Sequence, residues 1–349
     1  MMNNKLLTVI VPSYNMERFL AKCLQSLIVD DEQVRELLEV IVVNDGSKDK
    51  TSAIAHQYAN SYPDTFMVID KDNGHYGSCI NVGLKCATGK YVRVLDADDS
   101  YDTTNFKGFL RYLAASQNDT PDLILSDVEI VNDHDEVFHK EGCWRVGESV
   151  VGLDAKLAYE LRNVGLPYVT YLLERLKKID YRQTEHVCYS DTQWVTLPFV
   201  SVKTVCRYPH AVYRYLRGRE GQSMDSAFYR TNRLKMTAVC VMDSIRQMKR
   251  VEIGSDPGYQ YAVGRLLSSI KGIYDWAFFD SGESIPDDFL QKFDTELQVL
   301  SPEYYEKCSR FTIGKFKFHY ITLWRKHQSS KTLLFRGLLF LKRHFRKGR

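Results

Sequence analysis

The sequence lacks the patterns that mark several protein classes. Nine prolines and 20 glycines in 349 residues exclude a collagen-like or low-complexity chain. The eight cysteines include no CxxC pair, which argues against a cysteine-rich zinc site. No apolar run approaches the roughly 20 residues of a membrane span, and residues 1–5 lead into a short strand-like run rather than a signal peptide. We therefore expect reduced thiols and a cytoplasmic location.

Acidic residues are absent from the last 40 positions, 310–349, which hold 12 Lys and Arg. The other 309 residues hold 35 basic and 44 acidic side chains, so a mildly acidic body carries a basic tail. Apolar residues recur in the tail at helical spacings of four, three and four: Leu334, Leu338, Leu341 and Phe345. This pattern is typical of a basic amphipathic helix lying on a membrane, and the alternative is a helix packed on the protein.

The charge distribution also bears on partners and location. We expect residues 331–349 to contact an anionic membrane surface, which would make the protein peripheral on the inner face of the cell membrane. The acidic body does not indicate a nucleic-acid partner. With 44% hydrophobic residues, the chain can bury a sizeable core, which excludes wholesale disorder.

The first hundred residues alternate strand and helix signals. Apolar, β-rich runs predict strands at residues 6–11 (closed by Pro12), 39–43, 66–69 and 91–95, and helical spacing predicts helices at 19–28, 51–58 and 80–87. This order predicts an α/β fold with a mainly parallel sheet and helices on both faces.

The pattern loosens beyond residue 100 and changes near residue 220. Further strand signals lie at 122–126 and 200–216, and the helical segments are 228–250, 259–279, 286–299 and 331–345. We therefore expect three regions: a sheet domain at 1–220, divided at residue 100 into two halves, a helical extension at 221–330, and the tail at 331–349.

Polar clusters follow three of the predicted strands: residues 13–15, 44–46 and 96–99. Ligands bind at this edge of a parallel sheet, beyond the carboxyl ends of the strands. Asp96, Asp98 and Asp99 place three carboxylates in four residues. Packed carboxylates are costly to desolvate without a cation, and they suit Mg²⁺ or Mn²⁺ with substrate phosphates completing the shell. The alternative is a solvated acidic turn that caps the next helix.

For the other candidate site residues, the sequence spacing gives weaker evidence of a function. Asp45 either accepts from a base N–H or ribose hydroxyl, or belongs to a turn. His75 opens a helix within NGHYG at 73–77, where it is either a substrate contact or, more often, a polar loop residue. Taken alone, Asp191 is better explained as the cap of a helix that starts near Thr192 than as a catalytic residue. Arg214 and Arg217 are suited to neutralising a diphosphate or closing over it.

Three stretches together resemble family 2 glycosyltransferases: VIVPSYN at 9–15, VVNDGSKDKT at 42–51 and ATGKYVRVLDADD at 87–99. The specific resemblance covers about residues 6–100, and a looser one extends to about 223. It implies the GT-A fold, a nucleotide-diphosphate sugar as donor, commonly a UDP-sugar, and transfer with inversion at the anomeric carbon.

The resemblance also implies roles for single residues. Pro12, Tyr14 and Asp45 would line the nucleotide base pocket. Asp96 would contact ribose or the metal, Asp98 would ligate the metal, and Asp99 is an adjoining candidate. Asp191 would be the catalytic base, with Ser190 standing where the family usually has Glu. The segment 213–215 occupies the place where some members carry a histidine metal ligand.

We therefore expect a metal-dependent inverting glycosyltransferase that acts on a glycan or lipid-linked acceptor, in cell-surface or capsular polysaccharide synthesis. One alternative is a nucleotidyltransferase, which should show a GxG phosphate loop after the first strand; the sequence has no GxG. Another alternative is a sugar-nucleotide-binding protein without catalysis, against which the intact carboxylate run argues.

Overall fold

The computed structural model describes residues 5–116, 119–142, 145–218, 227–251, 256–280, 287–312, 319–327 and 337. The chain divides into two compact units. The first comprises Met1–Gln222 and Ile253–Ala262, and the second comprises Ser223–Glu252 and Val263–Arg349. All the residues considered above as donor-binding or catalytic candidates lie in the first unit.

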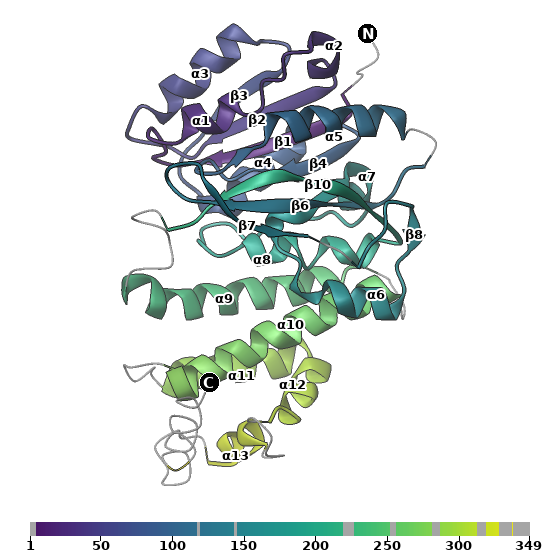
Figure 1. Ribbon diagram of the computed structural model, residues 1–349. Coiled ribbons are helices and arrows are strands. Elements are labelled where there is room, and N and C mark those ends of the chain that lie inside the picture. The colour runs from purple at the N-terminus through teal and green to yellow at the C-terminus, as the bar shows by residue number, and fades with distance from the viewer. Residues whose placement is uncertain are drawn as a thin grey trace. The chain divides into compact units, whose positions relative to one another are not determined.

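Within the described residues, ten strands form one mixed sheet (Figure 1). The main order is β3-β2-β1-β4-β9-β6-β10-β5, with β7 paired to β6 and β8 paired to β10. The strands are β1 Leu7–Ser13, β2 Leu38–Asn44, β3 Phe66–Asp70, β4 Tyr91–Val94, β5 Ser100–Tyr101, β6 Leu123–Val131, β7 Val137–Glu141, β8 Val151–Gly152, β9 Val169–Leu172 and β10 Thr204–Leu216.

The first four strands are parallel, as their alternation with helices predicts. β1 pairs in parallel with both β2 and β4, and β2 pairs in parallel with β3. Every residue of β1 and β2 is buried, which explains why both read as continuous apolar runs. The sheet becomes mixed beyond β4, because the four-residue strand β9 enters antiparallel between β4 and β6. β6 and β10 are again parallel.

Pro12 does not close the first strand, because β1 continues to Ser13 and Pro12 pairs with Val43. Ser13 accepts a hydrogen bond from the Asp45 N–H on the β2 side. Because successive residues of a strand face opposite neighbours, Pro12 faces the β4 side. The β1–β4 register ends at Ile10 and Val94, so the N–H that proline lacks is not needed there.

Helices flank the sheet of the first unit (Figure 1). They are α1 Leu20–Gln25, α2 Glu32–Arg35, α3 Thr51–Ser61, α4 His75–Cys86, α5 Thr103–Ala115, α6 Ala155–Glu160, α7 Leu173–Lys178 and α8 Asp191–Trp194. α5 illustrates the local rules. Asp102 caps it by accepting from the Asn105 N–H, and its buried residues recur at spacings of three, one and three: Phe106, Phe109, Leu110 and Leu113.

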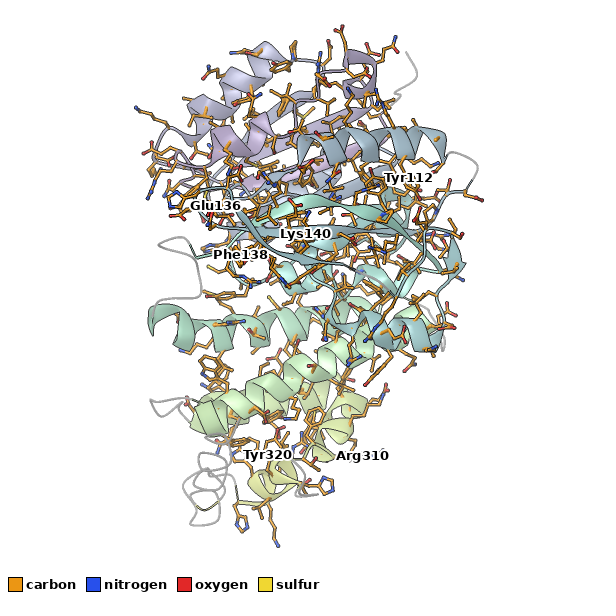
Figure 2. All side chains as sticks on the ribbon, viewed as in Figure 1. Tyr112, Glu136, Phe138, Lys140, Arg310 and Tyr320 are labelled. Carbon is orange, nitrogen blue, oxygen red and sulfur yellow. The ribbon has the colours of Figure 1, made fainter. Side chains whose placement is uncertain are left out.

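The second unit is helical in its described residues. It contains α9 Ala227–Met248, most of α10 Pro257–Asp275, a π-helical turn Trp276–Asp280, α11 Asp287–Leu300, α12 Pro302–Ser309 and α13 Tyr320–His327. The buried pair of Arg325 and Asp294 joins α13 to α11. Tyr320, labelled in Figure 2, donates to Asp275 Oδ1 at 2.6 Å and joins α13 to α10. These contacts fix a short helix that the sequence pattern did not predict.

The predicted amphipathic helix at 331–345 and the tail at 331–349 lie outside the described residues apart from residue 337, so the membrane contact stays a prediction. Among the helices that the structure describes, none combines the length and the apolar character that crossing a membrane requires.

Candidate functional site

The loops after β1 and β2 are joined at the carboxyl edge of the sheet. The Asn15 N–H donates to Ser47 Oγ at 3.0 Å, and Asn15 Oδ1 accepts from the Lys48 N–H at 2.9 Å. Asn15 adopts a left-handed backbone with φ 53°, which asparagine tolerates well. Between the two loops Pro12 is buried, whereas Tyr14 is 46% exposed. The structure therefore presents the Tyr14 ring at the edge where the sequence predicts a base pocket.

Asp45 lies one residue beyond β2 and is only 2% exposed. Its Oδ1 accepts from Lys71 Nζ at 2.6 Å and from the Gly74 N–H at 2.9 Å. A buried carboxylate is stable when a cation and a main-chain donor satisfy it in this way. Sequence reasoning missed Lys71, because a single lysine in a polar loop carries no signal of its partner.

The acidic run forms a tight turn after β4. The Asp99 N–H donates to the Asp96 carbonyl at 2.9 Å, and Ala97 is buried while Asp96 and Asp98 are half-buried. We call residues 96–99 the acidic turn. Burial raises the pKa of Asp99 well above its usual range, and the charges of Asp98 and Asp96 raise it further. The three carboxylates therefore stand close enough to repel one another.

Asp99 is engaged by the protein itself. Its Oδ2 accepts from the Tyr213 hydroxyl at 2.6 Å and its Oδ1 from the Leu216 N–H at 2.7 Å, and it is 4% exposed. Tyr213 Oη in turn accepts from the Asp96 N–H at 3.2 Å. Asp99 thus anchors the acidic turn to β10, and we do not retain it among the proposed metal ligands.

The two arginines of the β10 region have different surroundings. Alternation along a strand places Arg214 on the opposite face from Tyr213 and Tyr215. The Arg214 guanidinium pairs with Glu129 at 3.1 Å and with Asp135 at 3.2 Å. Because these two carboxylates already neutralise Arg214, we do not include it in the proposed diphosphate site.

Arg217 lies beside Tyr215. Its guanidinium lies 5.7 Å from the centre of the Tyr215 ring. Burial raises the pKa of the Tyr215 hydroxyl, and the charges of Asp99, Asp98 and Asp96 add to that effect while Arg217 opposes it. Tyr215 is therefore close to both the carboxylates and the Arg217 cation.

Asp191 begins α8, and the loop before it is fastened to the start of α4. The Gln183 N–H donates to Asn81 Oδ1 at 2.8 Å, and the His186 N–H donates to the Gly74 carbonyl at 2.8 Å. Ser190 is fully buried and donates to Gln183 Oε1 at 3.2 Å. Ser190 therefore stabilises the loop through a buried hydrogen bond, while Asp191 next to it is exposed.

Tyr76, in the first turn of α4, contacts the predicted donor carboxylate and lies within electrostatic range of the predicted base. Its hydroxyl donates to Asp96 Oδ1 at 2.8 Å. Burial raises the phenol pKa well above its usual value, and the charges of Asp96 and Asp191 raise it further. Sequence reasoning noted that 73–77 opens a helix but missed Tyr76. Its neighbour His75 has φ 64° and places Nδ1 3.8 Å from Cys188 Sγ.

The carboxylates of the acidic turn could supply part of the ligand shell of a metal ion. Among the described residues, no group of three or more His, Cys, Asp and Glu side chains is arranged to hold one. Asp96 and Asp98 still fit a hard divalent cation, because repulsion within the acidic turn, seen in the raised pKa of Asp99, would be relieved by positive charge. Mg²⁺ in proteins commonly binds one or two carboxylates and takes its other ligands from water and substrate phosphates.

Comparisons with known proteins bear on the family of the chain. Residues 8–145 match the family described as "Glycosyl transferase family 2". The minor teichoic acid biosynthesis protein GgaB of Bacillus subtilis is 36% identical over 112 residues, 32% of this chain and 12% of that protein. The poly(ribitol-phosphate) beta-N-acetylglucosaminyltransferase TarS of Staphylococcus aureus is 28% identical over 224 residues, 63% of this chain and 37% of that protein. The chain thus spans only a minor part of these relatives.

Solved structures show the same fold. The crystal structure of S. aureus TarS residues 1–349 has a TM-score of 0.65 at 16% identity, and the match covers 99% of this chain and 92% of that one. The complex of that fragment with UDP-GlcNAc has a TM-score of 0.61 at 18% identity, with 84% and 80% covered. The predicted α/β fold of GT-A type with a helical C-terminal region is therefore confirmed. Through residues 8–145, the chain carries a domain of the glycosyl transferase family 2.

Proposed function

We propose that the protein is an inverting glycosyltransferase that moves a sugar from a UDP-sugar to a hydroxyl group of a glycan or lipid-linked acceptor. The observation that carries the proposal is that the Tyr76 hydroxyl donates to Asp96 Oδ1 at 2.8 Å and that the charge of Asp191 also raises its pKa, so the Tyr76 side chain senses both carboxylates. A donor-binding carboxylate and a proton-accepting carboxylate must flank the same anomeric carbon in such a transfer, and these two come from segments about a hundred residues apart.

The donor nucleotide would bind between the loops after β1 and β2. The exposed ring of Tyr14 offers a flat surface on which a base can stack. Buried Asp45 offers a charged acceptor for a base N–H, supported by Lys71, and Pro12 closes the pocket floor. The ribose and diphosphate would then extend toward the acidic turn, where Asp96 is the nearest candidate for a ribose contact.

The diphosphate would be neutralised at the acidic turn. Asp98, with Asp96 beside it, would hold Mn²⁺ or Mg²⁺, which when bound stabilises charge on the leaving nucleotide. Arg217 adds a protein cation on the Tyr215 side of the turn. These residues favour departure of the diphosphate, because charge that develops on a leaving group is best stabilised by charges already in place.

Asp191 would act as the general base. The acceptor oxygen bonds to the anomeric carbon as the bond from that carbon to the diphosphate oxygen breaks, and the hydroxyl proton passes to the Asp191 carboxylate. The electron pair of the broken bond leaves with the nucleotide diphosphate. A positioned base of this kind contributes about 10²–10⁴-fold in rate.

The relatives support the choice of donor and suggest the class of acceptor. TarS has been crystallised with UDP and with UDP-GlcNAc and is named for transfer to poly(ribitol phosphate), and GgaB is named for teichoic acid biosynthesis. We therefore place the acceptor among cell-surface polymers or their lipid-linked precursors. The basic tail at 331–349 would bring the protein to the membrane face where such precursors lie.

The test is a binding screen followed by a turnover assay. Nucleotides and nucleotide sugars are screened with Mn²⁺ by thermal shift, because a ligand specific for the folded state raises its melting temperature. UDP release and pyrophosphate release are then measured with the best ligand. We expect UDP-sugars to bind and UDP to be released; pyrophosphate release from a nucleoside triphosphate would instead indicate a nucleotidyltransferase.

Asp191→Asn separates binding from catalysis. We expect this variant to bind the donor like the wild type but to lose transfer, because it removes only the proton acceptor. Asp180→Asn is the matched control, since Asp180 is an exposed carboxylate in the same region that pairs with Arg182 at 2.9 Å. Equal turnover by Asp191→Asn and wild type would contradict the assignment of the base.

A further inference from the structure

Tyr76 occupies a backbone position that the surrounding structure holds firmly. It follows His75, whose left-handed backbone turns the chain into α4. It precedes Gly77, where an added Cβ would stand 2.1 Å from the Thr184 carbonyl oxygen. Tyr76 thus lies between a residue with left-handed backbone and a glycine in close contact with another loop, so its backbone position is tightly held.

The hydroxyl of Tyr76 is directed to one carboxylate oxygen. It donates to Asp96 Oδ1 at 2.8 Å, so the phenol acts as a hydrogen-bond donor to this carboxylate. The main chain of Asp96 is held separately: its N–H donates to Tyr213 Oη at 3.2 Å, and its carbonyl accepts from Cys23 Sγ at 3.8 Å. Tyr76 therefore contributes a contact to the carboxylate rather than to the backbone of the acidic turn.

The same short segment also holds the loop that carries the predicted base. Gly74, two residues before Tyr76, accepts from the His186 N–H at 2.8 Å. Asn81, on the next turn of α4, donates to the Gln183 carbonyl at 2.9 Å. The start of α4 thus contacts the Asp191 loop through its backbone and through Asn81, and contacts Asp96 through the Tyr76 side chain.

We propose that Tyr76 is a positioning residue of the donor site, whose hydroxyl holds the Asp96 carboxylate in the orientation that receives the ribose or diphosphate of the donor. The inference rests on the proposed function, because it concerns how that site binds a nucleotide sugar. The start of α4 would then have two roles: the Tyr76 phenol orients the Asp96 carboxylate, and the backbone of the same turn positions the loop that carries Asp191.

Tyr76→Phe tests the inference, because it removes the hydroxyl and keeps the ring. The affinity for UDP with Mn²⁺ is measured by calorimetry, and KM and kcat are measured with the donor found in the screen. We expect UDP affinity to fall about tenfold, which is the effect of one hydrogen bond to a charged group. KM for the donor should rise by a similar factor, and kcat should change by less than about threefold, since the base loop is held by other groups.

Tyr112→Phe is the matched control. Tyr112 lies on α5 (Figure 2), and its hydroxyl is 3.2 Å from Cys206 Sγ. It too loses a hydroxyl with polar partners, Cys206 and Ser116, and neither of them belongs to the acidic turn. We expect its UDP affinity and KM to equal those of the wild type. Melting temperatures of both variants show whether folding has changed.

A double-mutant cycle identifies the partner through which Tyr76 acts. In an Asp96→Asn background the carboxylate is gone, so Tyr76→Phe should change UDP affinity by less than about twofold. The inference is overturned if Tyr76→Phe binds UDP like the wild type. It is also overturned if Tyr76→Phe costs as much in the Asp96→Asn background as alone, or if kcat and melting temperature fall while KM stays constant.

The proposed function and the inference fail in different ways. A wild-type protein that binds neither UDP nor any UDP-sugar overturns the proposed function and the inference with it. A wild-type protein that binds UDP, together with an unaffected Tyr76→Phe variant, overturns only the inference and leaves the glycosyltransferase assignment in place.

Discussion

Gly77→Ala should reduce transfer while sparing donor binding. Gly77 is buried in the first turn of α4, and an added Cβ would stand 2.1 Å from the Thr184 carbonyl oxygen. Real Cβ atoms essentially never approach another heavy atom closer than 3.0 Å. The loop that contains Thr184 must therefore move outward by about 1 Å, since packed interiors have no spare room for the methyl group.

The displacement acts on the predicted base. The loop leads from Gln183 through Ser190 to Asp191, and the Gln183 contacts with Asn81 resist the movement. A misplacement of about 1 Å can cost about 10²-fold in rate, so we expect kcat to fall by about that factor. The clash should also cost about 1–3 kcal/mol in stability. The residues assigned to contact the nucleotide lie on other segments, and we expect the Thr184 loop rather than α4 with Tyr76 to give way, so UDP affinity should change little.

Gly264→Ala is the matched control for this prediction. Gly264 lies exposed in α10, with nothing within 4 Å of an added Cβ. Alanine there should stabilise the protein by about 0.5–1 kcal/mol and leave kcat unchanged. The assays are UDP release, calorimetric titration with UDP, and thermal unfolding. A Gly77→Ala variant with wild-type kcat would refute the reasoning, because the contact between α4 and the loop would then not place the base.

Three further changes have distinct expected results. Arg217→Gln should raise the KM for the donor severalfold, whereas Arg214→Gln should leave it within about twofold because Arg214 is paired with acidic residues; equal effects on KM would contradict the two placements. Cys79 should resist iodoacetamide at pH 8, because burial and the charge of Asp45 raise its thiol pKa to about 12. Half-exposed Cys86 should react before Cys79, and peptide mass spectrometry measures both modifications. Deleting residues 331–349 should release the protein from anionic liposomes and spare donor hydrolysis; undiminished sedimentation with the liposomes would exclude the tail as the anchor.

Part of the fold follows from the sequence because it depends on local pattern. β1 and β2 are buried on both faces, so each of their residues is either apolar or hydrogen-bonded. Such continuous runs can be recognised as strands from the sequence alone. β9 illustrates the opposite case. It is four residues long and lies antiparallel between β6 and β4. These two strands begin 46 and 78 residues before Val169, the first residue of β9. Nothing in a short segment specifies such neighbours.

The same division applies to the candidate site. Asp45 and Asp96 were found because strand ends of a parallel sheet meet at one edge. Tyr76 was not, because its importance comes from a contact across 20 residues with Asp96. Arg214 was expected to face a diphosphate. The face of the strand on which it lies, and its acidic partners in β6 and the following turn, cannot be read from the sequence.

The central claim is that the acidic turn binds a nucleotide diphosphate through a divalent cation held by Asp98. Crystals grown with UDP and Mn²⁺ test it most directly, by an anomalous difference map collected at the manganese edge. We predict a peak about 2.0–2.3 Å from an Asp98 carboxylate oxygen and from oxygens of the diphosphate. A map in which the nucleotide is bound but the manganese peak is absent from the turn, or lies elsewhere, would contradict the claim.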